Sequence, residues 1–305
     1  MPDSMKEEII NSLLDAGASA VGFAKAGKIS SEVEAQFKNW IGEEFHGEMG
    51  YLERHIPLRQ HTDNVLQGAK TIISLAFSYV PAEWKTLSIT AYAYGEDYHN
   101  VLRKILRPII KDFQDKYGGK WRVCIDSAPV AERYCAVKSG IGKRGVNGSI
   151  IVEGCGSLCF LVEILTTIEI EPDKPSIEKC DSCGACIKIC PGKAIKGDGT
   201  IDARKCINYL TIEKKGDFTE EEKMTVSSNE GHLFGCDLCL RVCPYNIGLV
   251  PSGITEFNYS EEIRELTPWA IINMGKDEFK DLFSKSPLLY AGYEKLVRNA
   301  QTLKK

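Results

Sequence analysis

Cysteines are the residues of this chain with the clearest capacity for chemistry, because eight of its twelve lie between Cys180 and Cys243. The first four follow the spacing Cys-x2-Cys-x2-Cys-x3-Cys and are followed directly by Pro191. This is the spacing of bacterial ferredoxins, in which three thiolates on a tight loop bind one [4Fe–4S] cluster and the fourth binds a second cluster. The run therefore predicts a pair of [4Fe–4S] clusters.

A second run repeats the last three cysteines of that pattern and again ends in Cys-Pro. Its missing first cysteine is interpreted as Cys206, displaced upstream by an insertion. In two-cluster ferredoxins the fourth cysteine of each run binds the other cluster. We therefore expect two crossed ligand sets, which are Cys180, Cys183, Cys186 and Cys243 for one cluster and Cys206, Cys236, Cys239 and Cys190 for the other.

Structural zinc is the alternative for these cysteines, since repeated Cys-x2-Cys pairs also bind zinc. The uninterrupted four-cysteine run and the two Cys-Pro endings favour iron–sulfur clusters instead. The remaining cysteines lack ligand spacing and are predicted to be buried small apolar residues. These are Cys124, Cys135, Cys155 and Cys159.

Composition bounds the class of protein. The chain has 305 residues, of which 43% are hydrophobic, and this supports one large or two ordinary globular domains. A net charge of −4 excludes a global basic field for nucleic acid. No apolar run approaches the ~18 residues that span a bilayer, and the acidic N-terminus does not resemble a signal peptide. The expectation is a cytoplasmic protein with no membrane partner.

The region before the cysteines reads as alternating helices and strands. Apolar residues at helical spacing predict helices at 7–16, 30–41, 97–117 and 130–139, with Pro108 expected to kink the third. Runs rich in β-formers predict strands at 20–24, 71–80, 88–94, 121–125, 150–152 and 160–170. This pattern indicates a mixed α/β domain over 1–170.

Residues 171–255 change character, because short loops with glycine and proline surround the cysteines. Such a segment has little core material and is expected to depend on its clusters for folding. Residues 256–305 return to helical patterns and form a predicted C-terminal helical segment. A free ferredoxin needs little more than the cluster domain, so the domain at 1–170 is expected to receive the electrons.

Several segments of the chain resemble the epoxyqueuosine reductase family. The resemblance is carried by 122–129, by Glu132-Arg133, by 139–142, by 202–213 and by 234–239, with weaker support from 49–54 and 94–99. It implies an oxidoreductase of queuosine biosynthesis that uses cobalamin and two [4Fe–4S] clusters to convert epoxyqueuosine to queuosine in tRNA. The implied fold is an α/β (α+β) cobalamin-binding domain, a bacterial-type two-cluster ferredoxin module and a short helical C-terminus. A low-potential electron donor is the further expected partner.

The resemblance also implies roles for single residues. Asp126 matches the proton donor, and we expect burial to raise its pKa, since only a protonated carboxyl can donate. The residues alone favour another interpretation, in which Asp126 is a cap or turn residue before a helix with Pro129 in its first turn. Lys214 and Lys215 match a tRNA-contacting segment. The implied cobalamin contacts are Arg54, Tyr92, Asp126, Ile150, Leu161, Asn208, Cys236 and Asp237.

The loop at 140–148 departs from the family. Lys143 replaces a tryptophan and Val146 replaces a lysine, and we expect this loop on the substrate side of the corrin. The departure keeps open a paralogous corrinoid iron–sulfur reductase that acts on a small molecule or on a corrinoid protein. A third hypothesis is a ferredoxin-type electron-transfer protein whose N-terminal domain docks a partner.

Overall fold

A four-stranded sheet organises the computed structural model, which describes residues 2–84, 88–264 and 266–303. The strands are β1 (Ala20–Lys25), β2 (Thr71–Ser78), β3 (Trp121–Ile125) and β6 (Cys159–Thr166), in the spatial order β1-β2-β6-β3. Every neighbouring pair is antiparallel. The two central strands, β2 and β6, are almost wholly buried, which explains why their sequences are largely apolar on both faces.

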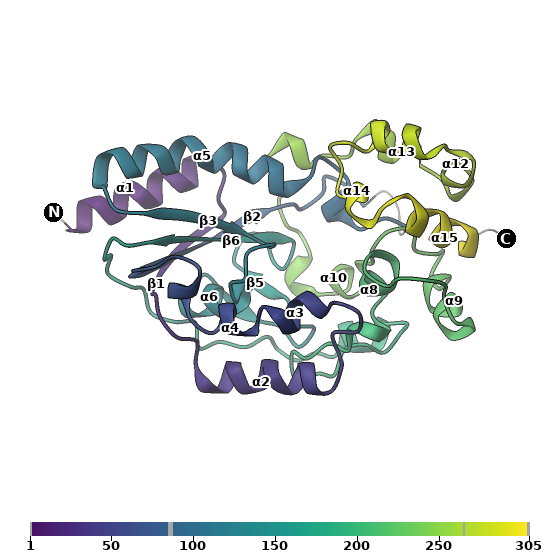
Figure 1. The fold of residues 1–305 in the computed structure, drawn as a ribbon, viewed down its shortest axis with the longest axis horizontal. Coiled ribbons are helices and arrows are strands. Elements are labelled where there is room, and N and C mark those ends of the chain that lie inside the picture. Colours follow the sequence, from purple (N-terminus) through teal and green to yellow (C-terminus); the bar gives the residue numbers. More distant parts are fainter. Residues whose placement is uncertain (1, 85–87, 265, 304–305) are drawn as a thin grey trace.

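Helices cover both faces of this sheet. On one face α1 (Pro2–Asp15) lies beside α5 (Tyr98–Tyr117), and on the other lie α6 (Glu132–Lys138) and, further out, α2 (Ser31–Gly42) (Figure 1). Asp97 caps α5 by accepting the backbone N–H of His99 at 2.9 Å. The helix continues through Pro108 and ends at Gly118, whose positive φ of 70° suits a residue without Cβ.

Short elements connect the sheet to the rest of the molecule. Between β1 and β2 lie α3 (Gly50–Arg54), α4 (Ile56–Arg59) and η1 (Thr62–Asn64), and a two-stranded antiparallel sheet joins β4 (Gly142–Arg144) to β5 (Ile150–Val152). The predicted strand at 88–94 is wrong. The structure instead has a 3-10 turn, η2 (Ala91–Ala93), because this segment pairs with the cluster region. The backbone N–H of Thr90 bonds to the carbonyl of Phe234 at 2.9 Å.

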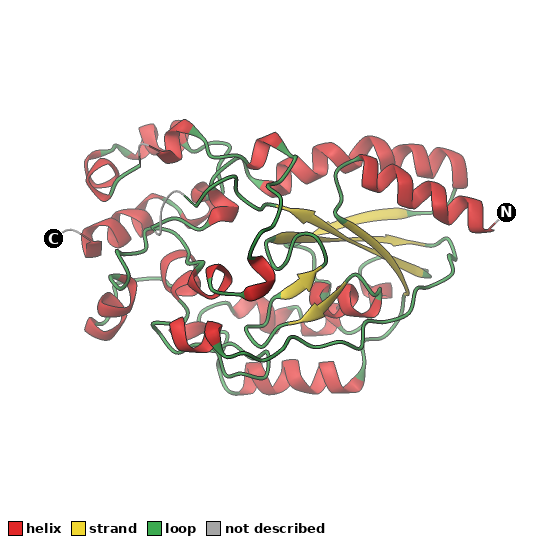
Figure 2. Cartoon of the chain, turned by 180° about the vertical axis from the view of Figure 1, so that it is seen from behind, coloured by secondary structure: helices red, strands yellow, loops and turns green. Residues whose placement is uncertain are grey.

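The cysteine-rich region consists of short helices joined by loops, as Figure 2 shows. Its elements are α7 (Ala185–Ile189), η3 (Ala203–Lys205), α8 (Ile207–Ile212), α9 (Glu220–Val226), α10 (Leu238–Arg241) and η4 (Pro244–Asn246). A capping box at Thr219 and Glu222 begins α9. No helix among the described residues is long and apolar enough to cross a membrane.

The C-terminal segment packs onto the rest of the chain. It contains η5 (Thr255–Phe257), α11 (Glu261–Arg264), α12 (Pro268–Asn273), α13 (Lys276–Leu282), α14 (Leu288–Ala291) and α15 (Tyr293–Leu303). Phe257, Leu288 and Leu296 share one apolar core with Ile9 and Phe77 of the sheet region. The segment is therefore anchored to both the sheet and the cluster region.

Candidate active site

The first cysteine group gathers around the loop that precedes α7. Burial, followed by the nearby Cys183 and Cys243 thiolates, raises the pKa of the Cys186 thiol. The thiolates of Cys183 and Cys180 likewise add to burial in raising the pKa of Cys243. A cavity is lined by these same four side chains, which come from two distant runs of the sequence. The fold thus brings Cys243 to the three cysteines of the first run.

The second group forms around α8 and α10. Burial raises the pKa of Cys239 far above its ordinary value, and the thiolates of Cys206, Cys236 and Cys190 add to the effect. Cys206 lies among these residues, although 30 positions separate it from Cys236 in the sequence. The two spatial groups coincide with the two crossed ligand sets expected from the spacing. Within the described residues, no three such side chains approach as closely as the ligands of a single metal ion do.

Backbone N–H groups point at the cysteine sulfurs. Val146 N lies 3.4 Å from Cys180 Sγ, and Ala194 N lies 3.3 Å from Cys190 Sγ. Hydrogen bonds of this kind stabilise thiolate charge and tune the potential of a cluster. Eight cysteines in two groups of four, with N–H donors on their sulfurs, fit two [4Fe–4S] clusters.

Asp126 lies at the end of β3, in a hydrogen-bonded chain with residues at the start of α5. Its Oδ2 accepts the Tyr98 hydroxyl at 2.9 Å and lies 3.4 Å from His99 Nε2. The other ring nitrogen of His99, Nδ1, lies 2.8 Å from Asp97 Oδ1. The Tyr98 ring is itself fixed by stacking on Phe160, with ring centroids 4.1 Å apart. The start of α5 therefore holds Asp126 from one side.

The expected rise in the pKa of Asp126 is wrong for this structure. Burial acts to raise the pKa of Asp126, but hydrogen bonds from His99 and Tyr98 outweigh it and lower the value. Burial likewise opposes the charge on His99, yet its bonds to Asp126 and Asp97 raise its pKa to about 9. The pair is thus an ionised carboxylate beside an imidazolium, and it holds one proton near the site.

Asp126 has neighbours on several elements besides α5. Its side chain is 60% exposed to solvent, so the carboxylate is accessible from outside. The pKa values of Tyr51, Tyr92 and Tyr290 are all raised, first by burial and then by nearby acids that include Asp126. Tyrosines from four elements, counting Tyr98 on α5, therefore lie within reach of the charge of this carboxylate.

Tyr51, Tyr98 and Tyr290 were not among the residues selected from the sequence. Tyr290 follows the clusters by many positions and approaches Asp126 through the packing of α14, with its hydroxyl 3.2 Å from Glu213 Oε1. No local motif marks such a residue. Tyr98 adjoins the capping Asp97, within one of the segments that resemble the family, and that position was the available signal.

Three other selected residues lie between Asp126 and the second cysteine group. Asn208 Oδ1 accepts the backbone N–H of Cys236 at 3.1 Å. Asp237 is buried and accepts the Thr90 hydroxyl at 2.6 Å and the Ala91 N–H at 2.5 Å. Tyr92 follows directly and feels the charges of both Asp237 and Asp126. The segment at 90–92 thus lies between the second cysteine group and Asp126.

The remaining selected residues occupy less direct positions. Arg54 is exposed at the end of α3, whereas Arg59 on α4 is half-buried and faces Asp126. Ile150 is buried in β5, and Leu161 lies on β6 with Ile150 in the same small apolar cluster. Sequence reasoning selected the first arginine of this region and missed the one that feels the carboxylate.

The lysines selected for tRNA lie on a braced loop after α8. Lys214 pairs with Glu222 at 3.3 Å, while Lys215 is exposed and its backbone N–H bonds to Glu48 Oε2 at 2.9 Å. Arg298 of α15 donates to the carbonyls of Lys214 and Gly216 at 2.9 and 2.7 Å. The cationic loop is therefore fixed in place, with Lys215 directed to solvent.

The departing loop at 140–148 lies against the first cysteine group. Lys143 Nζ is 3.1 Å from Glu178 Oε2 and 4.6 Å from the ring centre of Tyr245, which also lines the cavity of that group. The cation of Lys143 is thus neutralised near the cysteines, and Val146 contributes the N–H to Cys180 noted above.

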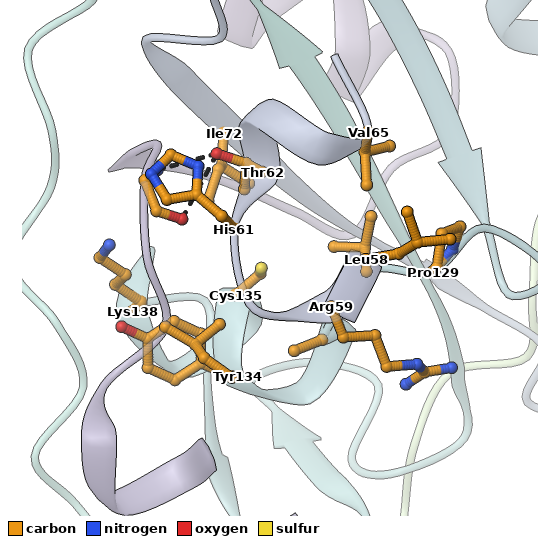
Figure 3. Close-up of a pocket in the computed structure, with 14 residues that line it drawn as sticks. Leu58, Arg59, His61, Thr62, Val65, Ile72, Pro129, Tyr134, Cys135 and Lys138 are labelled. Carbon is orange, nitrogen blue, oxygen red and sulfur yellow. Dashed lines mark hydrogen bonds between the residues drawn. The ribbon is translucent and has the colours of Figure 1, made fainter. Parts of the chain in front are cut away.

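A further cavity opens between α4 and α6, behind the Asp126 loop. Pro129, Tyr134 and His61 help to line it, and Arg59 extends from α4 with its guanidinium directed away from His61 (Figure 3). This cavity contains neither the cysteine groups nor Asp126. It is bordered by residues 129–131, which connect Asp126 to α6.

The fold and the two cysteine groups define an iron–sulfur protein with a mixed α/β catalytic domain. The model of the "4Fe-4S double cluster binding domain" matches residues 179–246, and that of "Epoxyqueuosine reductase QueG, DUF1730" matches 59–127. The chain is 35% identical to an epoxyqueuosine reductase of Cyclobacterium marinum over 93% of this chain and 91% of the relative. It is 33% identical to that of Escherichia coli over 88% and 73%.

Solved structures agree with these matches. The epoxyqueuosine reductase from Streptococcus thermophilus superposes with a TM-score of 0.86 at 27% identity, covering 98% of this chain and 80% of that one. An epoxyqueuosine reductase bound to an epoxyqueuosine-modified tRNA stem loop gives 0.88 at 27%, covering 99% and 81%. Another, from Bacillus subtilis, has its catalytic aspartate loop swung out of the active site. The chain belongs to the epoxyqueuosine reductase family.

Proposed function

We propose that this protein reduces the epoxide of epoxyqueuosine in tRNA to the alkene of queuosine. Membership of the family carries the proposal, together with the match of residues 179–246 to a double-cluster domain. A relative of the same fold binds a tRNA stem loop that carries this nucleoside. In the balanced reaction, the epoxide takes up two electrons and two protons and yields an alkene and water.

Electrons are supplied by the two cysteine groups. We assign Cys180, Cys183, Cys186 and Cys243 to one [4Fe–4S] cluster and Cys206, Cys236, Cys239 and Cys190 to the other. Cys236 directly precedes Asp237 and donates its backbone N–H to Asn208, so the second cluster is the one proposed to face the cofactor. Each cluster passes one electron at a time, and two transfers complete one turnover.

Cobalamin is the cofactor proposed to bind beside Asp126. When bound, it supplies a low-valent cobalt that is both a strong reductant and a nucleophile. The residues present fit such a group, because Asp126 is exposed and the tyrosines within reach of its charge include Tyr92, which also senses Asp237 next to Cys236 of the second cysteine group. The proposed contacts keep Tyr92, Asn208 and Asp237 and add Tyr51 and Tyr290.

Proton delivery is the proposed task of Asp126. In the open site its carboxylate is ionised beside the His99 imidazolium, 3.4 Å away. When water is excluded from Asp126 in the closed complex with the nucleotide, the separated charges lose their solvation and the neutral pair becomes favoured. The proton then moves from His99 Nε2 to Asp126 Oδ2, and Asp126 can donate it to the substrate oxygen. Tyr98 orients the carboxylate throughout by its hydrogen bond.

The tRNA is proposed to bind over the exposed face of Asp126, with Lys215 contacting a phosphate. A modified base in a tRNA loop can be unstacked and inserted into a pocket, as single-stranded bases are in other RNA complexes. Lys143 is paired with Glu178, so it is not proposed as a phosphate contact.

A nucleoside mass analysis tests the proposal. The protein with both clusters is incubated without oxygen with cobalamin, a low-potential reductant and tRNA that carries epoxyqueuosine. Conversion to queuosine is the expected result. Unconverted epoxyqueuosine, in a sample whose iron content and bound corrinoid have been verified, would contradict the proposed substrate and favour a paralogous reductase.

A further inference from the structure

The two cysteine groups differ in how the chain covers them. The segment at 90–92 bonds to residues on both sides of Cys236 in the second group, through the carbonyl of Phe234 and the carboxylate of Asp237. In the first group Cys183 is exposed, and the two residues before it, which line the same cavity, are exposed as well. The first group therefore lies at the surface of the protein.

This difference sets the direction in which electrons pass through the molecule. The second cluster is the one proposed to face the cofactor, so the first cluster is the one that meets a reductant from outside. An exposed ligand such as Cys183 brings the edge of its cluster close to whatever binds there. The surface around the first group is therefore where an electron donor has to dock.

Three exposed isoleucines lie close to the first group. Ile177 is 93% exposed and Ile247 is 74% exposed, while Ile187 on α7 is 39% exposed. Each lies within four residues of a cysteine of that group, so its Cα is at most about 14 Å from the Cα of a ligand. Single apolar residues on a surface are ordinary, but several gathered around one site mark a surface for interaction.

The charged residues around these isoleucines are mostly basic. The first group and its neighbours lie on the segments at 142–149, 177–188 and 243–248, which contain four basic and two acidic residues. The basic residues are Lys143, Arg144, Lys179 and Lys188, and the acidic ones are Glu178 and Asp181. A backbone bridge joins Arg144 to Lys179, and both side chains are exposed. This local excess of positive charge stands out in a chain whose net charge is −4.

We propose that an acidic protein that carries single electrons docks on the entry face, which consists of Ile177, Ile187 and Ile247 with Lys179 and Lys188. A small apolar centre with a charged rim suits the brief encounters of electron-transfer proteins, and the basic residues attract an acidic partner. In each encounter the carrier loses one electron and the first cluster goes from [4Fe–4S]²⁺ to [4Fe–4S]⁺. No covalent bond forms and no proton moves. The direction of transfer rests on the proposed function.

Reduction by a flavodoxin tests the entry face, in the full chain with both clusters and with neither cobalamin nor tRNA. Flavodoxin is a small acidic carrier, and stopped-flow absorbance follows the oxidation of its hydroquinone to the semiquinone. We expect a second-order rate constant that falls as salt rises. The double variant Ile177→Asp with Ile247→Asp should lower it by about tenfold or more, because the new carboxylates repel the carrier. Trp269→Asp, at a similarly exposed site on α12, is the matched control.

Titanium(III) citrate, a small chemical reductant, should reduce the wild type and the double variant at equal rates, since it does not need the entry face. A double variant that this reagent also reduces slowly has a damaged cluster. In that case Lys188→Gln decides, because the loss of one cation should flatten the salt dependence of the flavodoxin rate.

Equal flavodoxin rates in the wild type and the double variant would overturn the proposal. A wild type that flavodoxin does not reduce, or a salt dependence that Lys188→Gln leaves unchanged, would overturn it as well. The measurement contains no tRNA. A protein that behaves as expected here but leaves epoxyqueuosine unconverted therefore contradicts the proposed function and leaves the entry face standing.

Discussion

Tyr98 donates its hydroxyl to Asp126 Oδ2 at 2.9 Å, although the two residues lie 28 positions apart and on different elements. The bond exists because α5 begins beside the end of β3, and stacking on Phe160 leaves the phenol ring one orientation. Tyr98 stays protonated, since burial and then Asp126 raise its pKa. The Tyr98 hydroxyl therefore always donates to Asp126 Oδ2, and this hydrogen bond fixes the orientation of the carboxyl group.

Asp126→Asn is the direct test of the proton donor. Asparagine keeps the size and polarity of the side chain but carries no acidic proton. We expect both clusters and corrinoid binding to be retained, with turnover reduced by about 10²- to 10⁴-fold, the range that general acids contribute. Iron analysis and the visible spectrum check the cofactors, and nucleoside mass analysis checks turnover. Full activity in this variant would contradict the assignment.

His99 should set the pH at which Asp126 ionises. The imidazolium favours the charged carboxylate, so in His99→Gln burial dominates and the pKa of Asp126 should rise. The wild-type pair loses its transferable proton only when His99 ionises, at a pKa of about 9, whereas in the variant the only such proton is that of the Asp126 carboxyl itself. We therefore expect the alkaline limb of the kcat profile to move to lower pH by about one unit or more. The pH dependence of kcat measures this shift. Asn100→Asp, at the exposed next position on α5, is the control for a change of local charge.

The sheet could be predicted from the sequence because its strands are short segments rich in β-branched and other apolar residues. The segment at 88–94 has the same local character, yet it forms a turn since Thr90 and Ala91 bond to Phe234 and Asp237 far along the chain. Local propensity cannot anticipate a partner more than a hundred positions away. Tertiary hydrogen bonds decided the outcome there.

The candidate site shows the same limit. Cysteine spacing indicated both clusters because the chemistry of a cubane imposes it on a short segment, and the double-cluster match confirms it. The tyrosines around Asp126 come from four elements and have no spacing of their own. The pKa of Asp126 was predicted from burial alone, whereas two neighbours on α5 decide its sign. Such neighbours are known only once α5 and β3 are placed side by side.

The crossed cluster ligation predicts paired outcomes for two cysteine variants. Cys190→Ala should damage the cluster bound by Cys206, Cys236 and Cys239, and Cys243→Ala should damage the other. Each variant should lose about half of the iron, because each cluster carries four iron atoms. Iron analysis and electron paramagnetic resonance of the reduced proteins distinguish the two clusters. Cys135→Ala, a buried cysteine of α6, is the control that should retain all iron. Intact iron in both variants would overturn the crossed scheme.

Lys215 should contribute to tRNA affinity by contacting a phosphate, whereas Lys214 mainly stabilises the loop after α8 through its ion pair. Lys215 is exposed, whereas Lys214 is paired with the Glu222 of the α9 capping box. We expect Lys215→Ala to weaken binding and to lower the salt slope of log K by about 0.7 to 0.9, the value for one phosphate contact. Filter binding over a salt series measures it. Lys111→Ala, an exposed lysine of α5, should leave the slope unchanged.

The burial of Glu163 should make the free energy of unfolding depend on pH. This carboxyl is fully buried without hydrogen bonds, and burial raises its pKa well above the ordinary value of 4.5. In the unfolded chain it ionises near 4.5, so above that pH the folded state binds the extra proton. Stability is then lost as pH rises, by about 1.4 kcal/mol per pH unit, until the folded carboxyl also ionises.

Glu163→Gln removes this loss, since the amide has a similar shape and does not titrate. We expect the variant to melt near the wild-type temperature at pH 5 and several degrees above it at pH 8, at about 2–4 °C per kcal/mol. Thermal unfolding of both proteins between pH 5 and pH 8, with clusters intact, provides the measurement. Glu171→Gln, which is exposed, should show no such divergence. Parallel melting curves for Glu163→Gln and the wild type would mean that Glu163 is ionised in the folded protein, with a partner that compensates its charge.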